Sequence, residues 1–125
     1  MLRNLDHIAI IVSNENNLEF YKKLGFAETK RFERSYDTVI FMESAGGELD
    51  GSIVLEIFVD PSHPDRASEP ETKGLRHVAF TVDDLDEIIN FIDCEPVRKD
   101  WFGRRFTFTK DPDGQPIELK EAYNN

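Results

Sequence analysis

The chain has 125 residues and a formal net charge of −10 at pH 7, with 39% hydrophobic and 32% charged residues. This length suffices for one domain with a hydrophobic core, and the acidity argues against nucleic acid or an anionic membrane surface as a partner. No apolar run approaches the roughly 18 residues of a transmembrane helix, and the N-terminus lacks a signal-peptide pattern. Because Cys94 is the only cysteine, no intramolecular disulfide can form, and we expect a cytoplasmic protein.

The first half of the chain predicts a strand, a helix and three further strands. The segment LDHIAIIV (5–12) is rich in strand-forming residues. Leu18, Tyr21 and Leu24 then recur at helical spacing, and Gly25 suits a left-handed helix stop. Strand-like runs follow at 27–34, 37–43 and 52–59, with a turn signal at Gly46-Gly47.

The second half repeats the first. The segment LRHVAFTV (75–82) matches LDHIAIIV in its Leu, His, Ala and Val positions. A helical pattern follows, because apolar residues recur at i, i+3, i+4 and i+7 from Leu85 to Ile92, and Asp84 with Glu87 resembles a capping box. Strand-like runs then lie at 95–100, 104–110 and 115–121, with the turn signal DPDG before the last of them.

Each half therefore predicts the order βαβββ, and the whole chain predicts an α+β fold. We place the first module at residues 1–59 and the second at 75–125, as parts of a single domain of residues 1–125. Residues 60–74 between them are polar and contain three prolines, which is typical of a linker.

Four residues stand out in matched positions of the two halves. His7 and His77 occupy the same place in the two opening segments, whereas Glu56 and Glu118 lie between apolar residues in the last strands. A carboxylate inside an apolar strand is costly unless it is paired or binds a metal. Any one of these residues alone would more often be structural, but two histidines and two glutamates in matched slots predict a divalent-metal site. His63 has no repeat partner and is expected at the surface.

These residues, on two βαβββ modules, resemble the vicinal oxygen chelate superfamily, which comprises glyoxalases, bleomycin-resistance proteins and extradiol dioxygenases. The resemblance covers about residues 5–121 and is carried by LDHIAIIV, FYKKLGF, GLRHVAFTVDDLD and RRFTFTKDPDGQPIELKE. Within the group the chain looks similar to the small glyoxalase I-like proteins. This resemblance implies mixed sheets that curl around a metal cleft, and one divalent ion (Ni, Co, Mn or Zn) held by His7, Glu56, His77 and Glu118. Extradiol dioxygenases use two histidines and one glutamate, so Glu56 argues against that branch.

The resemblance implies lactoylglutathione lyase chemistry, which isomerises the hemithioacetal of methylglyoxal and a thiol and so detoxifies methylglyoxal. A divalent metal stabilises the negative charge of the enediolate, and a neighbouring carboxylate carries the proton between adjacent carbons. By resemblance, Glu118 is the expected base and Glu56 its counterpart.

The thiol cosubstrate is where the chain departs from the family pattern. Glutathione-using bacterial relatives carry an arginine at the position of Ile11 and an asparagine at that of Asp60, and an aspartate there would repel the glutathione carboxylates. Arg105 and Arg66 are candidates for anion contact, and we assign Arg105 to substrate binding, although each is more simply a surface arginine.

The family resemblance also implies a homodimer with a small-molecule substrate, its site built within one chain or from modules of two chains. Two alternatives stay open. One is another metalloenzyme on the same scaffold, such as an epimerase, a thiol transferase or a dioxygenase. The other is a non-enzymatic protein that binds a drug or metabolite and confers resistance, against which the complete ligand set weighs.

Overall fold

The computed structural model describes residues 1–44, 51–67 and 69–123. The chain divides into two compact units, Met1–Pro64 and Asp65–Asn125, and the division falls within residues 60–74. The turn signal at Gly46-Gly47 lies outside the described residues.

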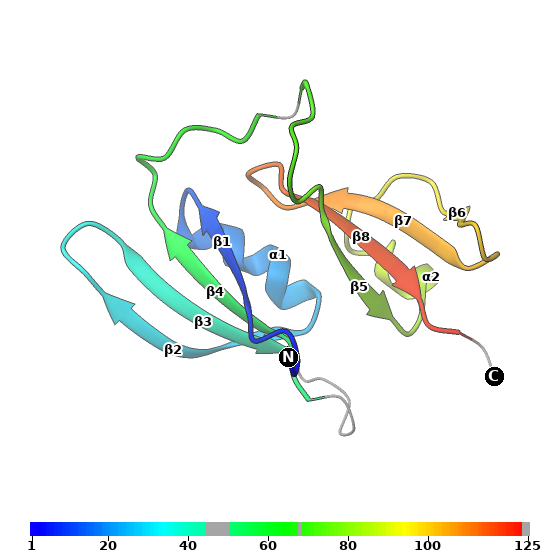
Figure 1. Cartoon of the computed structure of the whole chain (residues 1–125), viewed down its shortest axis with the longest axis horizontal. Helices are drawn as coiled ribbons and strands as arrows, with labels where there is room; N and C mark the ends of the chain where they lie inside the picture. Colours follow the sequence, from blue (N-terminus) through cyan, green and yellow to red (C-terminus); the bar gives the residue numbers. More distant parts are fainter. Residues whose placement is uncertain (45–50, 68, 124–125) are drawn as a thin grey trace. The chain divides into compact units, whose positions relative to one another are not determined.

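The first unit is a four-stranded sheet with one helix (Figure 1). The strands have the spatial order β1-β4-β3-β2, with β1 parallel to β4 and the other neighbours antiparallel. In chain order the elements are β1 (Ile8–Val12), the 3-10 turn η1 (Glu15–Asn17), α1 (Leu18–Lys23), β2 (Phe26–Glu33), β3 (Thr38–Ser44) and β4 (Val54–Val59).

The second unit has the same topology. Its sheet has the order β5-β8-β7-β6, and its first strand β5 again pairs in parallel with its last strand β8. The elements are β5 (Val78–Val82), α2 (Leu85–Ile88), β6 (Arg98–Lys99), β7 (Arg105–Lys110) and β8 (Pro116–Glu121). The predicted α+β class and the βαβββ order of each half are therefore confirmed.

The helix ends illustrate where local sequence signals hold and where they are overridden. Helix α1 is followed by Leu24 and then by Gly25 with φ +104°, which is the left-handed stop that the glycine predicts. Asp84 caps α2 by accepting hydrogen bonds from the backbone N–H groups of Asp86 (2.9 Å) and Glu87 (3.4 Å). The helix ends at Ile88, however, and does not extend to Ile92 as the apolar pattern predicts.

The segment after α2 is tied to strand β7 by hydrogen bonds. The hydroxyl of Thr109 donates to the carbonyl of Asp93 (2.7 Å), and that of Thr107 donates to the carbonyl of Glu95 (2.6 Å). The N–H of Glu95 in turn donates to the carbonyl of Phe108 (2.9 Å). Regular pairing with β7 is confined to Arg98–Lys99, so the strand predicted at 95–100 is much shorter in the structure.

The last strand of each sheet has one core face and one open face. Leu55 and Ile57 are fully buried on β4, whereas Glu56 between them is half-buried. Ile117 and Leu119 are likewise fully buried on β8, on either side of the half-buried Glu118. Because side chains alternate along a strand, each glutamate points to the face opposite the hydrophobic core. We call these the open faces of the two sheets.

Candidate functional site

The first pair of predicted ligands lies at the edge of the first sheet. In the parallel register of β1 and β4, Ala9 is opposite Glu56, and His7 precedes Ala9 by two residues. The histidine therefore falls on the same face as the glutamate. Its Nε2 lies 3.4 Å from Glu56 Oε1, with the side chains of His7 and Glu56 39% and 23% exposed. The regular strand begins at Ile8, one residue after the histidine.

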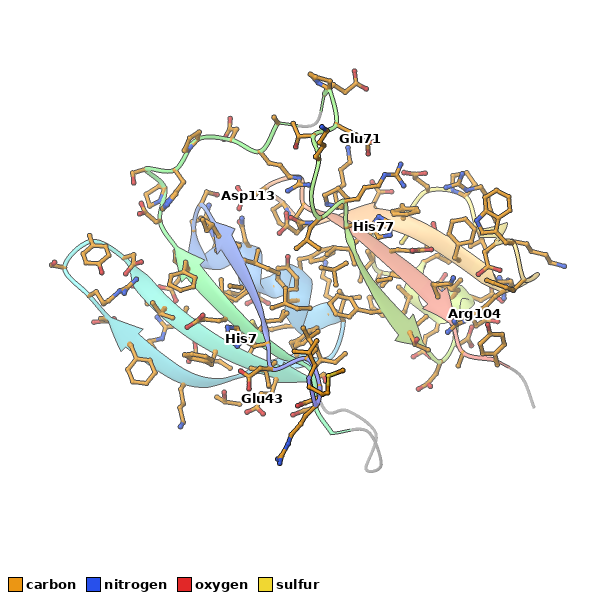
Figure 2. The ribbon with its side chains drawn as sticks, viewed as in Figure 1. His7, Glu43, Glu71, His77, Arg104 and Asp113 are labelled. Carbon is orange, nitrogen blue, oxygen red and sulfur yellow. The ribbon has the colours of Figure 1, made fainter. Side chains whose placement is uncertain are left out.

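The second pair repeats this arrangement. Ala79 is opposite Glu118 in the register of β5 and β8, and His77 precedes Ala79 by two residues. His77 Nε2 lies 3.1 Å from Glu118 Oε1, and the exposed fractions are 23% for His77 and 13% for Glu118. Figure 2 labels His7 and His77, each at the start of the first strand of its sheet. The repeat seen in the sequence is thus a repeat of three-dimensional register.

A phenylalanine lies beside each glutamate on its other flank. Phe41 on β3 is opposite Glu56, and Phe108 on β7 is opposite Glu118. The His77 ring contacts Phe108 edge-on, with ring centroids 4.9 Å apart and an interplanar angle of 88°. Sequence analysis missed both phenylalanines, because Phe41 and Phe108 stand at different distances along the chain from their glutamates. Only the strand register brings them to equivalent places.

The environment of His7 includes a second carboxylate. Its Nδ1 lies 2.7 Å from Asp6 Oδ2. This hydrogen bond is the main cause that raises the pKa of His7 above its ordinary value. Desolvation lowers the pKa, and the negative charges of Glu56 and Asp6 raise it further.

Each pair brings an imidazole nitrogen close to a carboxylate oxygen. The separation is 3.1 Å for His77 and Glu118, which is a hydrogen-bond distance, and 3.4 Å for His7 and Glu56. Both atom types are ligands of divalent metal ions. Within the described ranges, no group of three or more His, Cys, Asp or Glu residues is arranged to hold a metal ion. The four predicted ligands therefore come together as two pairs, one in each unit.

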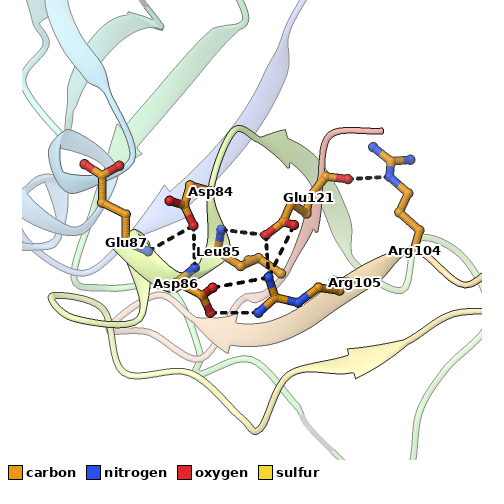
Figure 3. A network of polar contacts seen from close by, with 7 residues as sticks. All are labelled: Asp84, Leu85, Asp86, Glu87, Arg104, Arg105 and Glu121. Atoms are coloured by element: carbon orange, nitrogen blue, oxygen red, sulfur yellow. Dashed lines mark hydrogen bonds and ion pairs between the residues drawn. The ribbon is translucent and has the colours of Figure 1, made fainter. Parts of the chain in front are cut away.

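Arg105 lies in a network of polar contacts with Asp86 and Glu121 (Figure 3). Phe106 and Phe108 share the open face with Glu118, so Arg105 lies on the opposite face of the sheet. Its guanidinium contacts Asp86 at 2.7 Å and Glu121 at 3.0 Å, and Glu121 also accepts from the N–H of Leu85 (3.0 Å). This network ties α2 to β7 and β8, and we leave Arg105 outside the proposed site.

Arg66, the other arginine considered for anion contact, and His63, expected at the surface, each have a partner within their own unit. Arg66 donates to Gln115 Oε1 at 3.2 Å, a contact within the second unit. His63 Nδ1 lies 3.2 Å from Asp60 Oδ2, and its side chain is exposed.

An ion pair between the half-buried Lys120 and the buried side chain of Asp100 lies at one end of the second open face. Lys120 shares this face with Glu118, and its Nζ lies 2.6 Å from Asp100 Oδ2. The other oxygen of Asp100 accepts from the N–H groups of Phe102 and Arg104, both at 2.9 Å. The hydrogen bond from Lys120 is the main cause that lowers the pKa of Asp100 from 3.8 to about 2. The two residues are far apart in the sequence, so no local pattern predicted their pairing.

Asp100→Asn is expected to destabilise the second unit at neutral pH and to have little effect in strong acid. Because the folded-state pKa of about 2 lies below the ordinary 3.8, the ionised carboxylate stabilises the fold above pH 3.8. This contribution is lost as the pH falls from 3.8 to about 2. Urea unfolding at several pH values measures the difference in free energy of unfolding between wild type and Asp100→Asn. Asp83→Asn, at an exposed aspartate, is the control. If the difference in free energy of unfolding does not become smaller as the pH falls, ionised Asp100 does not stabilise the fold in this way.

Among the described residues, no helix has the length and apolar character needed to cross a membrane.

Comparison with known proteins identifies the family. The model of the Glyoxalase/Bleomycin resistance protein/Dioxygenase superfamily matches residues 4–119. The chain therefore belongs to this superfamily, and the resemblance found in the sequence is confirmed.

Similar proteins occur in several bacteria. YwkD of Bacillus subtilis is 44% identical over 133 residues, covering 97% of this chain and 98% of that protein. YaeR of Escherichia coli is 39% identical over 130 residues, covering 96% of this chain and 97% of that protein. Both are described as uncharacterized. A solved glyoxalase family protein from Enterococcus faecalis is 37% identical, with a TM-score of 0.80, and covers 95% of this chain and 98% of that one.

Proteins with different roles share the fold. The trypanothione-dependent glyoxalase I of Leishmania major is 25% identical, with a TM-score of 0.70, covering 96% of this chain and 87% of that one. A bleomycin-binding protein solved with bleomycin is 16% identical, with a TM-score of 0.64, covering 97% of this chain and 100% of that one, and its likeness concerns the fold alone. Membership of this fold therefore does not by itself define an activity.

Proposed function

We propose that this chain is a divalent-metal-dependent lyase or isomerase of the glyoxalase I type, acting on a hemithioacetal-like small molecule. The observation that supports this most directly is the pair of His–Glu contacts, His7 with Glu56 and His77 with Glu118, at identical strand register. The proposal requires both pairs to hold one ion, taken as Ni, Co, Mn or Zn. The two pairs would come from one chain or from two chains of a homodimer.

The site residues divide the chemistry between them. A bound divalent ion would supply positive charge against the negative charge that develops on the substrate oxygens. Glu118 is the proposed base: it takes a proton from the carbon next to the carbonyl and returns it to the neighbouring carbon, so the product keeps every atom of the substrate. Glu118 is 13% exposed against 23% for Glu56. Greater shielding from water favours return of the proton to the substrate over its loss to solvent.

The surroundings of the first pair bear on the thiol. Ile11 follows Ala9 by two residues on β1, so it shares the open face with Glu56. Ile11 is 49% exposed. Asp60 accepts hydrogen bonds from the N–H and hydroxyl of Ser62. An apolar residue and an engaged carboxylate suit an uncharged part of a thiol better than a carboxylate of glutathione. We therefore propose that glutathione is not the preferred cosubstrate.

The test is metal-dependent turnover of methylglyoxal hemithioacetals. Metal-free protein is reloaded with Ni, Co, Mn or Zn and supplied with methylglyoxal equilibrated with glutathione or with an uncharged thiol such as 2-mercaptoethanol. We expect turnover that requires metal and that proceeds at least as fast with the uncharged thiol. The metal-free protein and an enzyme-free mixture serve as controls.

The outcomes separate the alternatives. Metal binding without hemithioacetal turnover would favour another metalloenzyme of the fold, such as an epimerase, a thiol transferase or a dioxygenase. No metal binding would favour a non-enzymatic binding protein and would make His7 and His77 structural residues. Homodimer formation and a cytoplasmic location stay predictions.

A further inference from the structure

The two candidate histidines are held in different ways. His7 Nδ1 lies 2.7 Å from Asp6 Oδ2. Arg76 precedes His77 in the matching position, and its guanidinium pairs with Glu71 at 2.9 Å. The His77 ring packs edge-on against Phe108 instead. Figure 2 labels Glu71 together with the two histidines.

The aromatic support of His77 has no counterpart among the described contacts of His7. Phe41 is the structural equivalent of Phe108, but its described edge-on partner is Phe32, with ring centroids 6.1 Å apart. His7 is also the more exposed of the two histidines, at 39% against 23%. Packing therefore constrains the His7 ring less, and the hydrogen bond to Asp6 has more influence on its orientation.

The contact with Asp6 determines which ring nitrogen carries the proton. An ionised carboxylate only accepts hydrogen bonds, so Nδ1 must donate to it. The Asp6 contact at 2.7 Å is shorter than the 3.4 Å contact between Nε2 and Glu56, so a neutral ring keeps its proton on Nδ1. Nε2 then presents a lone pair toward Glu56, which is the form in which imidazole binds a metal.

We propose that Asp6 is a positioning residue that fixes the Nδ1–H tautomer and the orientation of His7, leaving Nε2 as the metal-binding nitrogen. The metal-binding part rests on the proposed function, whereas the tautomer is a property of the metal-free chain. Asp6 contacts the histidine and acts through it. Because the Asp6 side chain is exposed, its substitution leaves the hydrophobic core unchanged. In known metal sites, carboxylates that accept from a ligand histidine have this effect.

The first experiment measures the tautomer in metal-free protein. Nitrogen-15 NMR of labelled histidine rings, at about pH 9, well above the ordinary imidazole pKa, reports which nitrogen is protonated. We expect Nδ1–H for His7 in wild type and a shift toward Nε2–H in Asp6→Ala. Asp6→Asn keeps a carbonyl acceptor and is expected to restore Nδ1–H in large part. Arg76→Ala, the matched control, should leave the tautomers of both histidines unchanged.

The second experiment measures zinc affinity by competition with a chelator. Asp6→Ala is expected to weaken binding about tenfold, the lower end of the range for residues that support metal ligands. Asp6→Asn should recover part of the loss, and Arg76→Ala should bind as wild type. An Nε2–H tautomer in wild type, or an Asp6→Ala variant with unchanged tautomer and affinity, would overturn the inference. A shifted tautomer in a protein that binds no metal would uphold the role of Asp6 while refuting the proposed function.

Discussion

Wild-type protein purified without added chelator or metal is expected to carry about one divalent ion for each set of four ligands, and Glu56→Gln is expected to lose it. An amide oxygen is neutral and binds a divalent ion more weakly than a carboxylate. Removal of residues that merely support ligands typically costs 10–100-fold in affinity, so loss of a ligand should cost more than about 100-fold. Elemental analysis of both proteins, followed by chelator competition, makes the measurement.

Glu43→Gln is the matched control for Glu56→Gln. Glu43 lies two residues after Phe41 on β3, so it shares the open face with Glu56, but it contacts the hydroxyl of Ser52 and not a described histidine. We expect Glu43→Gln to bind metal as wild type does. Equal loss in both glutamine variants would indicate a general effect of negative charge on the sheet, and no loss in Glu56→Gln would remove Glu56 from the ligand set.

Glu118→Gln is expected to lower kcat for the hemithioacetal by about 10²–10⁴-fold, the usual contribution of a positioned acid–base group. The measurement is made at saturating metal, with bound metal determined on the same sample, because the substitution also weakens a ligand. Glu56→Gln, measured in the same way, is expected to lose less kcat, since Glu118 is the proposed base.

Glu121→Gln is the control that distinguishes a loss of catalysis from structural damage to strand β8. Glu121 lies on the opposite face of β8, where it pairs with Arg105 at 3.0 Å. Its substitution is expected to lower the thermal stability of the second unit without changing kcat at a temperature where the protein is folded. Comparable kcat losses in Glu118→Gln and Glu121→Gln would trace both to damage of the sheet. A larger loss of kcat in Glu56→Gln than in Glu118→Gln would identify Glu56, and not Glu118, as the base.

The sequence by itself determined the repeat, the βαβββ order of each half and the family. These features are local or depend on matched spacing: alternation of buried residues around Glu56 and Glu118 marks the last strands, and the shared LxHxA pattern marks the first. The histidines and glutamates were recognisable because they interrupt an apolar pattern at matched places. Their pairing within each unit follows from parallel register, which the topology of each half makes possible.

Only the tertiary structure decided which residues surround those pairs. Phe41 and Phe108 reach equivalent positions through strand register, since connections of different length hide the match in the sequence. The hydroxyls of Thr107 and Thr109 donate to the carbonyls of Glu95 and Asp93, and so tie the chain beyond the predicted helix to β7. Arg105 turns to the far face because alternation along β7 separates it from Phe106. The register of the phenylalanines and the hydrogen bonds of the threonines join segments distant in sequence, so no local pattern predicts them. Alternation places Arg105 opposite Phe106, but only the pairing of β7 with β8 shows which face carries Glu118.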